Sequence, residues 1–209
     1  MSGKFSAQAR NWPVNRVLVS AAVAAVVVGG VAFAVLAQDR PEQTGYRVSD
    51  RGVLTIDVKD RPEVPDIRGK TVEGKPFRLS DYRGKTVVVN AWAFWCGPCR
   101  LEMPMLVDFE KSMKDKGVVV VGINHGSNIG ASKAFVREFD VTYPNLHDPL
   151  GKSTLDMPKG IIQSRGVPYT FVIDARQKVA SSASGAINRE MLDEMTDWAM
   201  KPSKKPTGR

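Results

Sequence analysis

The sequence predicts a domain of the α/β class with a mixed sheet, and three observations indicate it. Apolar, β-branched runs that have the pattern of buried strands alternate with stretches whose apolar residues recur at helical spacing. The composition, with 43% hydrophobic and 25% charged residues, is that of a globular chain able to build a core. A length of 209 residues allows one ordinary domain together with an anchor or tail.

The expected elements follow from these patterns in chain order. Two short strand-like pieces, at 71–72 and 77–79, flank Gly74 and suggest a hairpin. Longer apolar runs predict strands at 85–92, 117–123, 169–173 and 179–184. Helical periodicity predicts helices at 98–116, 132–139 and 188–200. Pro104 lies inside the first of these helices and should kink it.

The N-terminal residues predict a membrane anchor. Residues 1–16 form a segment with three basic and no acidic residues, and residues 17–38 carry no charge. The 21 residues from Val17 to Ala37 would reach roughly 32 Å as a helix, enough for a bilayer core of about 30 Å. A signal peptide cleaved after Ala37 is the alternative, although its apolar run is ordinarily shorter. Under either interpretation we expect the rest of the chain to lie outside the cytoplasm.

Composition also divides the remainder of the chain. Residues 39–63 are rich in Asp, Arg, Glu and Pro and are expected to form a stalk with one short strand at 53–58. The domain follows at 64–200, and the Lys/Pro/Ser tail at 201–209 should be disordered. Seven of the 30 basic residues lie in the acid-free ends, which leaves 23 basic against 22 acidic residues between Asp39 and Met200. Despite the net charge of +8, a nucleic-acid-binding face is therefore not indicated.

The two cysteines carry the predicted chemistry. Cys96-Gly97-Pro98-Cys99 comes directly after a predicted strand and at the start of a predicted helix. Backbone N–H groups and the dipole at a helix N-terminus stabilise a thiolate and lower its pKa from about 8.5. The second thiol lies one turn later, within reach of a disulfide, and Pro98 pre-forms the first turn because no N–H is needed there. We expect Cys96 to be the exposed nucleophile and Cys99 the more buried resolving thiol.

Two other interpretations of this cysteine pair are possible from its spacing. Half of a zinc site has the same spacing, but the second half is missing, because the only histidines, His125 and His147, lie 22 residues apart. A purely structural disulfide is the other alternative. No metal and no cofactor are expected.

The surrounding sequence resembles a known family. Residues 90–104, which read NAWAFWCGPCRLEMP, are similar to the active-site segment of the membrane-anchored thioredoxin-like proteins of the TlpA/ResA/CcmG group. Residues 79–85 resemble the stretch that leads into that segment, and residues 166–174 resemble the family's proline loop and the strand after it. The similarity covers about 64–200. It implies a thioredoxin fold with an added N-terminal β-hairpin and an insertion between the central strand and the helix.

The resemblance also implies roles for individual residues beyond the cysteines. A cis peptide bond is implied between Val167 and Pro168, where the backbone of Val167 would pair with a substrate strand. Asn90 stands where ordinary thioredoxins have a proton-accepting Asp, and an amide cannot take that proton. Glu102 is the family's substitute acid, and its spacing places it on the same helix face as Cys99. We hypothesise that Glu102 tunes the thiol pKa values and takes the proton of Cys99; an ordinary surface glutamate is the alternative.

Two tryptophans lie close to the cysteines in the sequence. Trp92 and Trp95 are expected to pack under and beside the site, and Trp95 is also a candidate substrate contact. Gly97 and Pro98, together with Asn90, are expected to support the site rather than to react.

The implied function is that of a thiol:disulfide oxidoreductase acting outside the cytoplasm. It would reduce disulfides in exported proteins, such as an apocytochrome c or a copper-site protein, and receive electrons from a membrane thiol reductase. Gly97 and Pro98 are the pair found in reducing thioredoxins, whose potential is about −270 mV against about −120 mV for strong oxidants. An oxidant that donates its disulfide to exported proteins is the alternative.

Other functional classes fit the sequence less well. A peroxidase of the peroxiredoxin class requires Thr or Ser three residues before its cysteine and Pro four before that, but Ala93 and Val89 precede Cys96. A copper chaperone resembling the Sco proteins would have three residues between its cysteines, where this chain has two, and a histidine close to the proline loop. His147 lies 21 residues before Pro168. A redox-inactive binding domain is disfavoured because both thiols and Pro168 are intact.

Overall fold

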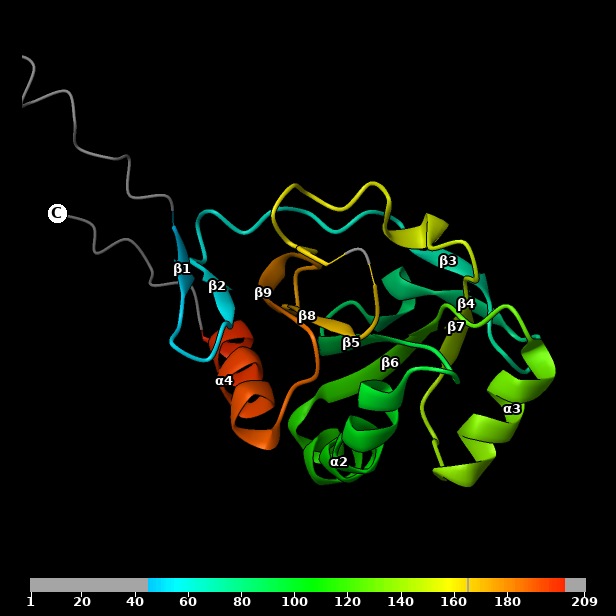
Figure 1. Cartoon of the computed structure of the whole chain (residues 1–209). Coiled ribbons are helices and arrows are strands. Elements are labelled where there is room, and N and C mark those ends of the chain that lie inside the picture. The colour runs from blue at the N-terminus through cyan, green and yellow to red at the C-terminus, as the bar shows by residue number, and fades with distance from the viewer. Residues whose placement is uncertain (1–44, 165, 202–209) are drawn as a thin grey trace, which may run out of the picture. The chain divides into compact units, whose positions relative to one another are not determined.

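A seven-stranded mixed sheet forms the centre of the computed structural model, which describes residues 45–164 and 166–201 (Figure 1). In spatial order its strands are β1 (Tyr46–Val48), β2 (Leu54–Ile56), β9 (Val179–Ser184), β8 (Tyr169–Ile173), β5 (Thr86–Trp92), β6 (Val118–Asn124) and β7 (Asn145–His147). Strands β5, β6 and β7 are parallel to one another, and the remaining neighbours pair antiparallel. The α/β class with a mixed sheet is thus confirmed.

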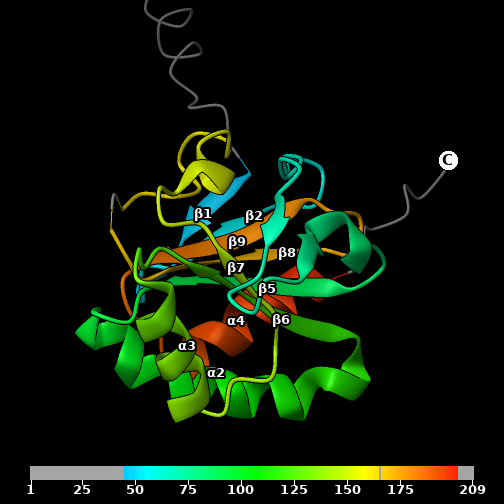
Figure 2. The ribbon, with the colours of Figure 1, turned by 90° about the vertical axis from the view of Figure 1, so that its right-hand side faces the viewer.

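The two faces of the sheet are covered differently. Helices α2 (Gly97–Met113), α3 (Ile129–Glu138) and α4 (Arg189–Met200) all lie on one face, as Figures 1 and 2 both show. The opposite face carries the antiparallel pair β3 (Arg68–Lys70) and β4 (Pro76–Arg78), the 3-10 turn Leu79–Tyr82 and the loop at 149–164. Each face has its own hydrophobic cluster, so the strands between them are buried on both sides.

This double burial explains why the long strands were predictable. All seven residues of β5 are buried, and β-branched apolar side chains fill both of its faces instead of alternating with polar ones. The bounds predicted for β8 and β9 are those observed, whereas β5 begins one residue later than predicted and β6 is shifted by one residue at both ends. The register places Asn90 of β5 opposite Thr170 of β8.

Helix ends depend on capping side chains. Helix α3 begins three residues earlier than predicted, because the Asn128 side chain accepts a hydrogen bond from the Ala131 N–H and caps the helix there. Asn188 caps α4 in the same way, through the N–H of Met191. Helix α2 includes Pro104 and gives way to a 3-10 turn at Lys114–Lys116.

The stalk expected at 39–63 is wrong for residues 45–63, although the short strand expected at 53–58 is observed as β2. Strands β1 and β2 form here, and β2 pairs antiparallel with β9 and extends the main sheet. Arg61 follows them and is buried, with its guanidinium donating to the Asp174 carboxylate at 3.0 Å and to the Trp198 carbonyl oxygen at 2.7 Å. The charged composition of residues 45–63 therefore did not indicate that this segment belongs to the domain.

The insertion also lies elsewhere than expected. Only residues 93–96 separate β5 from α2, so nothing is inserted directly after that strand. The added helix and strand, α3 and β7, instead follow β6. The last of the 3-10 turns, Lys152–Thr154, belongs to the loop that follows β7.

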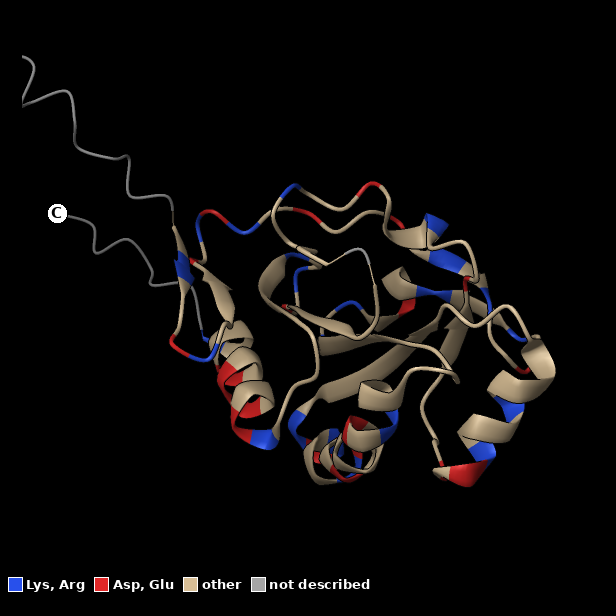
Figure 3. Cartoon of the chain, in the orientation of Figure 1, with Lys and Arg blue, Asp and Glu red and all other residues tan. Residues whose placement is uncertain are grey.

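The predicted membrane span at 17–38 and most of the predicted tail lie outside the described residues. Among residues 45–164 and 166–201, no helix is both long enough and apolar enough to cross a bilayer. Basic and acidic residues are interspersed along the elements in Figure 3, as the near-neutral charge between Asp39 and Met200 leads us to expect.

Candidate active site

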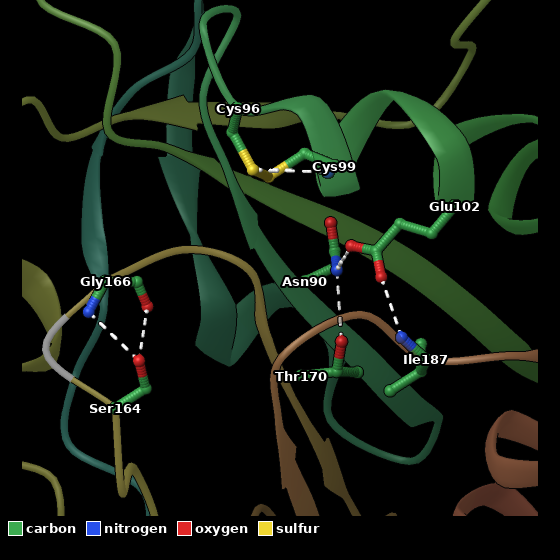
Figure 4. The surroundings of a disulfide bond; sticks show 8 residues. All are labelled: Asn90, Cys96, Cys99, Glu102, Ser164, Gly166, Thr170 and Ile187. Atoms are coloured by element: carbon green, nitrogen blue, oxygen red, sulfur yellow. Dashed lines mark hydrogen bonds between the residues drawn. A yellow bond between two sulfur atoms is a disulfide. The ribbon is translucent and has the colours of Figure 1, made fainter.

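The two cysteines form a disulfide at the N-terminus of α2, with their Cα atoms 5.3 Å apart (Figure 4). Cys96 is the residue that caps this helix, and its Sγ accepts a hydrogen bond from the Cys99 N–H at 3.2 Å. Pro98 occupies the first turn. The sulfur of Cys96 thus lies where unpaired N–H groups and the helix dipole favour negative charge.

Burial of the two cysteines follows the predicted order, but Cys96 is much less exposed than expected. Cys99 is fully buried and Cys96 is only 4% exposed, so the disulfide form does not present a widely exposed nucleophile. Cys96 is still the more accessible of the two. The predicted packing of Trp95 is also wrong, because this side chain is 63% exposed, which leaves it free to contact a substrate. Trp92 is fully buried and stacks on Phe135 with a ring-centroid distance of 4.6 Å.

Glu102 is buried one turn after Cys99, so the alternative of a surface glutamate is wrong. Its carboxylate accepts hydrogen bonds from Asn90 Nδ2 at 2.8 Å and from the Ile187 N–H at 3.0 Å (Figure 4). Burial raises the pKa of Glu102 to about 7, although the two hydrogen bonds favour the ionised form. A carboxyl group with such a pKa can both accept and release a proton at neutral pH.

Asn90 is held in one orientation by its two acceptors. Its Nδ2 donates to Glu102 and also to Thr170 Oγ1 at 3.0 Å, which uses both amide protons. The Oδ1 atom is buried and has no hydrogen-bond donor among the described residues. In Figure 4 this oxygen points toward the side of the disulfide. Asn90 therefore presents an unused acceptor next to the redox pair.

The proline loop enters the sheet beside the cysteines. The Val167–Pro168 peptide bond is cis, as the resemblance implies. Strand β8 begins directly after it and pairs with the C-terminal end of β5, from which the chain leads to Cys96. Within the described residues, no hydrogen bond engages the backbone N–H or C=O of Val167. Just before it, Ser164 Oγ accepts from the Gly166 N–H and donates to the Gly166 carbonyl oxygen.

The fold thus brings Asn90 and Glu102 together, next to the helix turn that carries Cys99, and adds two partners that sequence reasoning missed. These are the Thr170 hydroxyl and the Ile187 N–H. A signal for Thr170 was present, because it is a polar, non-aromatic side chain in an otherwise aromatic and aliphatic strand at 169–173, but its pairing with Asn90 depends on strand register. Among the described residues no three His, Cys, Asp or Glu side chains gather as a metal-binding group would require.

Comparison with known proteins agrees with this geometry. The AhpC/TSA family profile matches residues 61–182. The thiol-disulfide oxidoreductase ResA of Oceanobacillus iheyensis is 28% identical over 183 residues, which cover 86% of each chain. ResA of Bacillus thuringiensis is 33% identical over 135 residues, or 63% of this chain and 73% of the relative.

Solved structures give the same result. A DsbF homologue from Corynebacterium diphtheriae superposes with a TM-score of 0.65 and 30% identity, over 72% of this chain and 96% of the other. A thiol:disulfide interchange protein of the thioredoxin family from Chlorobium tepidum gives a TM-score of 0.60 and 30% identity, over 68% and 97%. The thioredoxin fold is thereby confirmed. The chain belongs to the AhpC/TSA family and is a thiol-disulfide oxidoreductase of the TlpA/ResA/CcmG-like group.

Proposed function

We propose that this protein reduces disulfide bonds in exported polypeptides, outside the cytoplasm. The supporting observation is the Cys96–Cys99 disulfide at the N-terminus of α2 with a buried carboxyl group one turn away. The dithiol form is the reactive one. Its Cys96 thiolate attacks one sulfur of the substrate disulfide and forms a mixed disulfide, and the other substrate sulfur leaves as a thiolate that takes a proton from water.

The second step releases the substrate. The Cys99 thiol gives its proton to the Glu102 carboxylate, and the resulting thiolate attacks Cys96 Sγ. The mixed disulfide breaks, and the second substrate sulfur leaves and is protonated. The substrate has then gained two electrons and two protons, and the protein is left with its own disulfide.

The proposal also covers how the substrate binds and where the electrons come from. The free backbone groups of Val167 would pair with an extended segment of the substrate, and exposed Trp95 would contact it. Electrons return from a membrane thiol reductase. An apocytochrome c or a copper-site protein is the proposed substrate class, and the segment at 17–38 is proposed to anchor the chain in the membrane with its catalytic domain outside.

Equilibration with glutathione tests the direction of transfer. A reductant should have a potential near that of thioredoxin, about −270 mV, whereas a value near about −120 mV would mark a disulfide donor and overturn the proposal. A peroxidase is not proposed, because Ala93 and Val89 replace the residues that such a cysteine needs.

A trapping experiment identifies the substrates. In Cys99→Ser the mixed disulfide cannot be resolved, so exported proteins should accumulate disulfide-linked to Cys96 and be identifiable by mass spectrometry. Cys96→Ser is the matched control and should trap none of them. Equal capture by both variants would contradict the assignment of Cys96 as the attacking thiol.

A further inference from the structure

A pocket of about 490 Å³ opens on the face of the sheet that carries no helices. We call it the His125 pocket. Two elements of the main sheet supply its floor: His125 directly follows β6, and Tyr169 is the first residue of β8. The loop at 149–164 supplies its wall. Tyr169 belongs to the cluster on this face, whereas both cysteines belong to the cluster on the helix face.

A directed chain of hydrogen bonds runs along the pocket floor. The Thr154 hydroxyl donates to the Gly151 carbonyl oxygen, so Thr154 Oγ1 accepts from the Tyr169 hydroxyl at 3.1 Å. The Tyr169 oxygen in turn accepts from His125 Nε2 at 3.2 Å. Burial lowers the pKa of His125, and the nearby Asp148 carboxylate opposes this effect, so the ring is neutral at neutral pH. Its Nδ1 is then an acceptor, since a neutral imidazole carries one proton.

Nothing in the described part of the chain pairs with His125 Nδ1. Gly151 lies beside this edge of the ring, and a Cβ at position 151 would lie 3.3 Å from Nδ1 and 3.0 Å from Cε1. Glycine there, with a φ of +64°, leaves the edge uncovered. A ligand with an N–H or O–H group would satisfy the acceptor.

The wall of the pocket is mixed, with Lys159 and Ser164 among its polar residues, but it includes an apolar part that is open to solvent. Leu150 and Leu155 are 71% and 75% exposed, and both line the pocket beside Met157, so exposed apolar surface is gathered at one place. A ligand that covers these side chains would bury apolar surface. The pocket therefore suits a group with a flat apolar body and a single hydrogen-bond donor at its edge.

Val167 connects this pocket to the disulfide. Its side chain packs against the clusters on both faces of the sheet, so it lies at the rim where the two faces meet. A substrate segment that pairs with the Val167 backbone runs along that rim. An extended segment on this path could place one side chain over the pocket while its cysteine lies at the disulfide.

We propose that the His125 pocket receives a tryptophan or tyrosine side chain of the disulfide-containing polypeptide, a few residues from the cysteine that Cys96 attacks. This inference rests on the proposed function and adds a sequence preference to it. The indole N–H or phenol O–H donates to His125 Nδ1, and the ring covers Leu150 and Leu155.

Peptide disulfides test the preference. Reduced protein is mixed with a series of peptides that differ at one position, which holds Trp, Phe or Ala and is moved in turn across the positions around the cysteine. The quantity compared is the ratio of rate constants within one protein, so any general change in thiol reactivity cancels. At the best position, wild type should prefer Trp over Ala by about tenfold and Trp over Phe by about threefold.

Three variants separate the contributions. Leu155→Asn should reduce the Trp-over-Ala ratio to about twofold or less, because part of the apolar wall is lost. His125→Phe should abolish the Trp-over-Phe difference while keeping a preference for aromatic residues over Ala. Val48→Asn is the matched control, since Val48 is 64% exposed on β1 and does not line the pocket, and it should change neither ratio.

Two results would overturn the proposal. Equal rates for Trp, Phe and Ala at every position would refute the subsite and leave the disulfide reductase activity standing. Unchanged ratios in Leu155→Asn and His125→Phe would place the preference somewhere other than this pocket. If wild type reduced neither the peptides nor glutathione disulfide, the proposed function itself would fail, and the subsite with it.

Discussion

Glu102 is the residue whose environment most clearly departs from the ordinary. The residue is 3% exposed, and burial raises the pKa of its carboxyl group to about 7 despite two hydrogen bonds that favour the charged form. A group buried at such cost without a function would be expected to be replaced by an amide or an apolar residue. Its place one turn after the resolving thiol explains why an acid is useful there.

Substitution of Glu102 by glutamine should change how stability depends on pH. The folded pKa lies above the unfolded value, so protonated Glu102 contributes stability that is complete below about pH 4.5 and lost as the pH rises through about 7. Between these limits wild type should lose about 3 kcal/mol relative to Glu102→Gln. Urea unfolding of both oxidised proteins from pH 4.5 to 8 measures the difference. A difference that does not change with pH would contradict the raised pKa.

For individual residues, the sequence predicted most of the side chains that belong to the site but not which of them hydrogen-bond to one another. Cys96, Cys99 and Glu102 follow from a short motif on one helix, where spacing alone determines their relative positions. The bond between Asn90 and Thr170 could not be predicted, because it requires the register of two strands that are 80 residues apart in the chain. The burial of Cys96 depends on the loops around it, which spacing does not describe.

Among the elements, α4 contributes to the site through its N-terminus. Asn188 caps this helix, and the preceding residue, Ile187, donates its backbone N–H to Glu102. The first turn of α4 therefore holds one of the two hydrogen bonds that stabilise the Glu102 carboxylate. A change that loosens this turn should therefore alter the environment of Glu102 at the redox site.

Removal of the α4 cap should raise the pKa of Glu102 further. Asn188→Ala is expected to cost about 1 kcal/mol in stability and to weaken the Ile187 bond. Asn128→Ala, which removes the corresponding cap of α3, is the matched control: it should cost a similar amount and leave Glu102 unaffected. Carbon-13 NMR of the Glu102 carboxyl group follows the pKa directly. If Glu102 had the same pKa in both variants, the proposed dependence of the site on the α4 cap would be wrong.

Prediction of elements succeeded where burial on both faces leaves a continuous apolar run. This holds for β5, β6, β8 and β9. Strand β2 lies within the short strand expected at 53–58, but β1 has three residues among charged neighbours and no periodicity marks it, and the sequence did not indicate that either strand joins the main sheet. They exist because β2 pairs with β9, a tertiary contact that the local sequence does not encode.

For the whole molecule, Arg61 joins segments that are distant in the chain. Its guanidinium donates to Asp174 after β8 and to the carbonyl oxygens of Trp198 and Ala199 at the end of α4, while its Nε donates to Ile56. Burial by itself raises the pKa of Asp174, but hydrogen bonds from Arg61 and from backbone N–H groups outweigh it and hold that pKa below its ordinary value. These hydrogen bonds of Arg61 hold residues 45–63 against the rest of the domain.

Arg61→Met should destabilise the whole domain. It leaves the Asp174 carboxylate buried without its main partner, at an expected cost of about 3 kcal/mol or more in the free energy of unfolding. The exposed pair of Arg51 with Glu194 provides the control, and Arg51→Met should cost less than about 1 kcal/mol. Thermal and urea unfolding measure both. Similar costs for the two variants would show that the N-terminal segment is a peripheral attachment.

The proposed chemistry depends most on the acidity of Cys96 at the start of α2, and the pH dependence of Cys96 alkylation tests this acidity directly. In reduced Cys99→Ser, the reaction of Cys96 with iodoacetamide should follow a thiolate whose pKa lies at least about one unit below the ordinary value of about 8.5. A pKa at or above about 8.5 would mean that the helix N-terminus does not activate this sulfur. The proposed attack of Cys96 on substrate disulfides would then lose its physical basis.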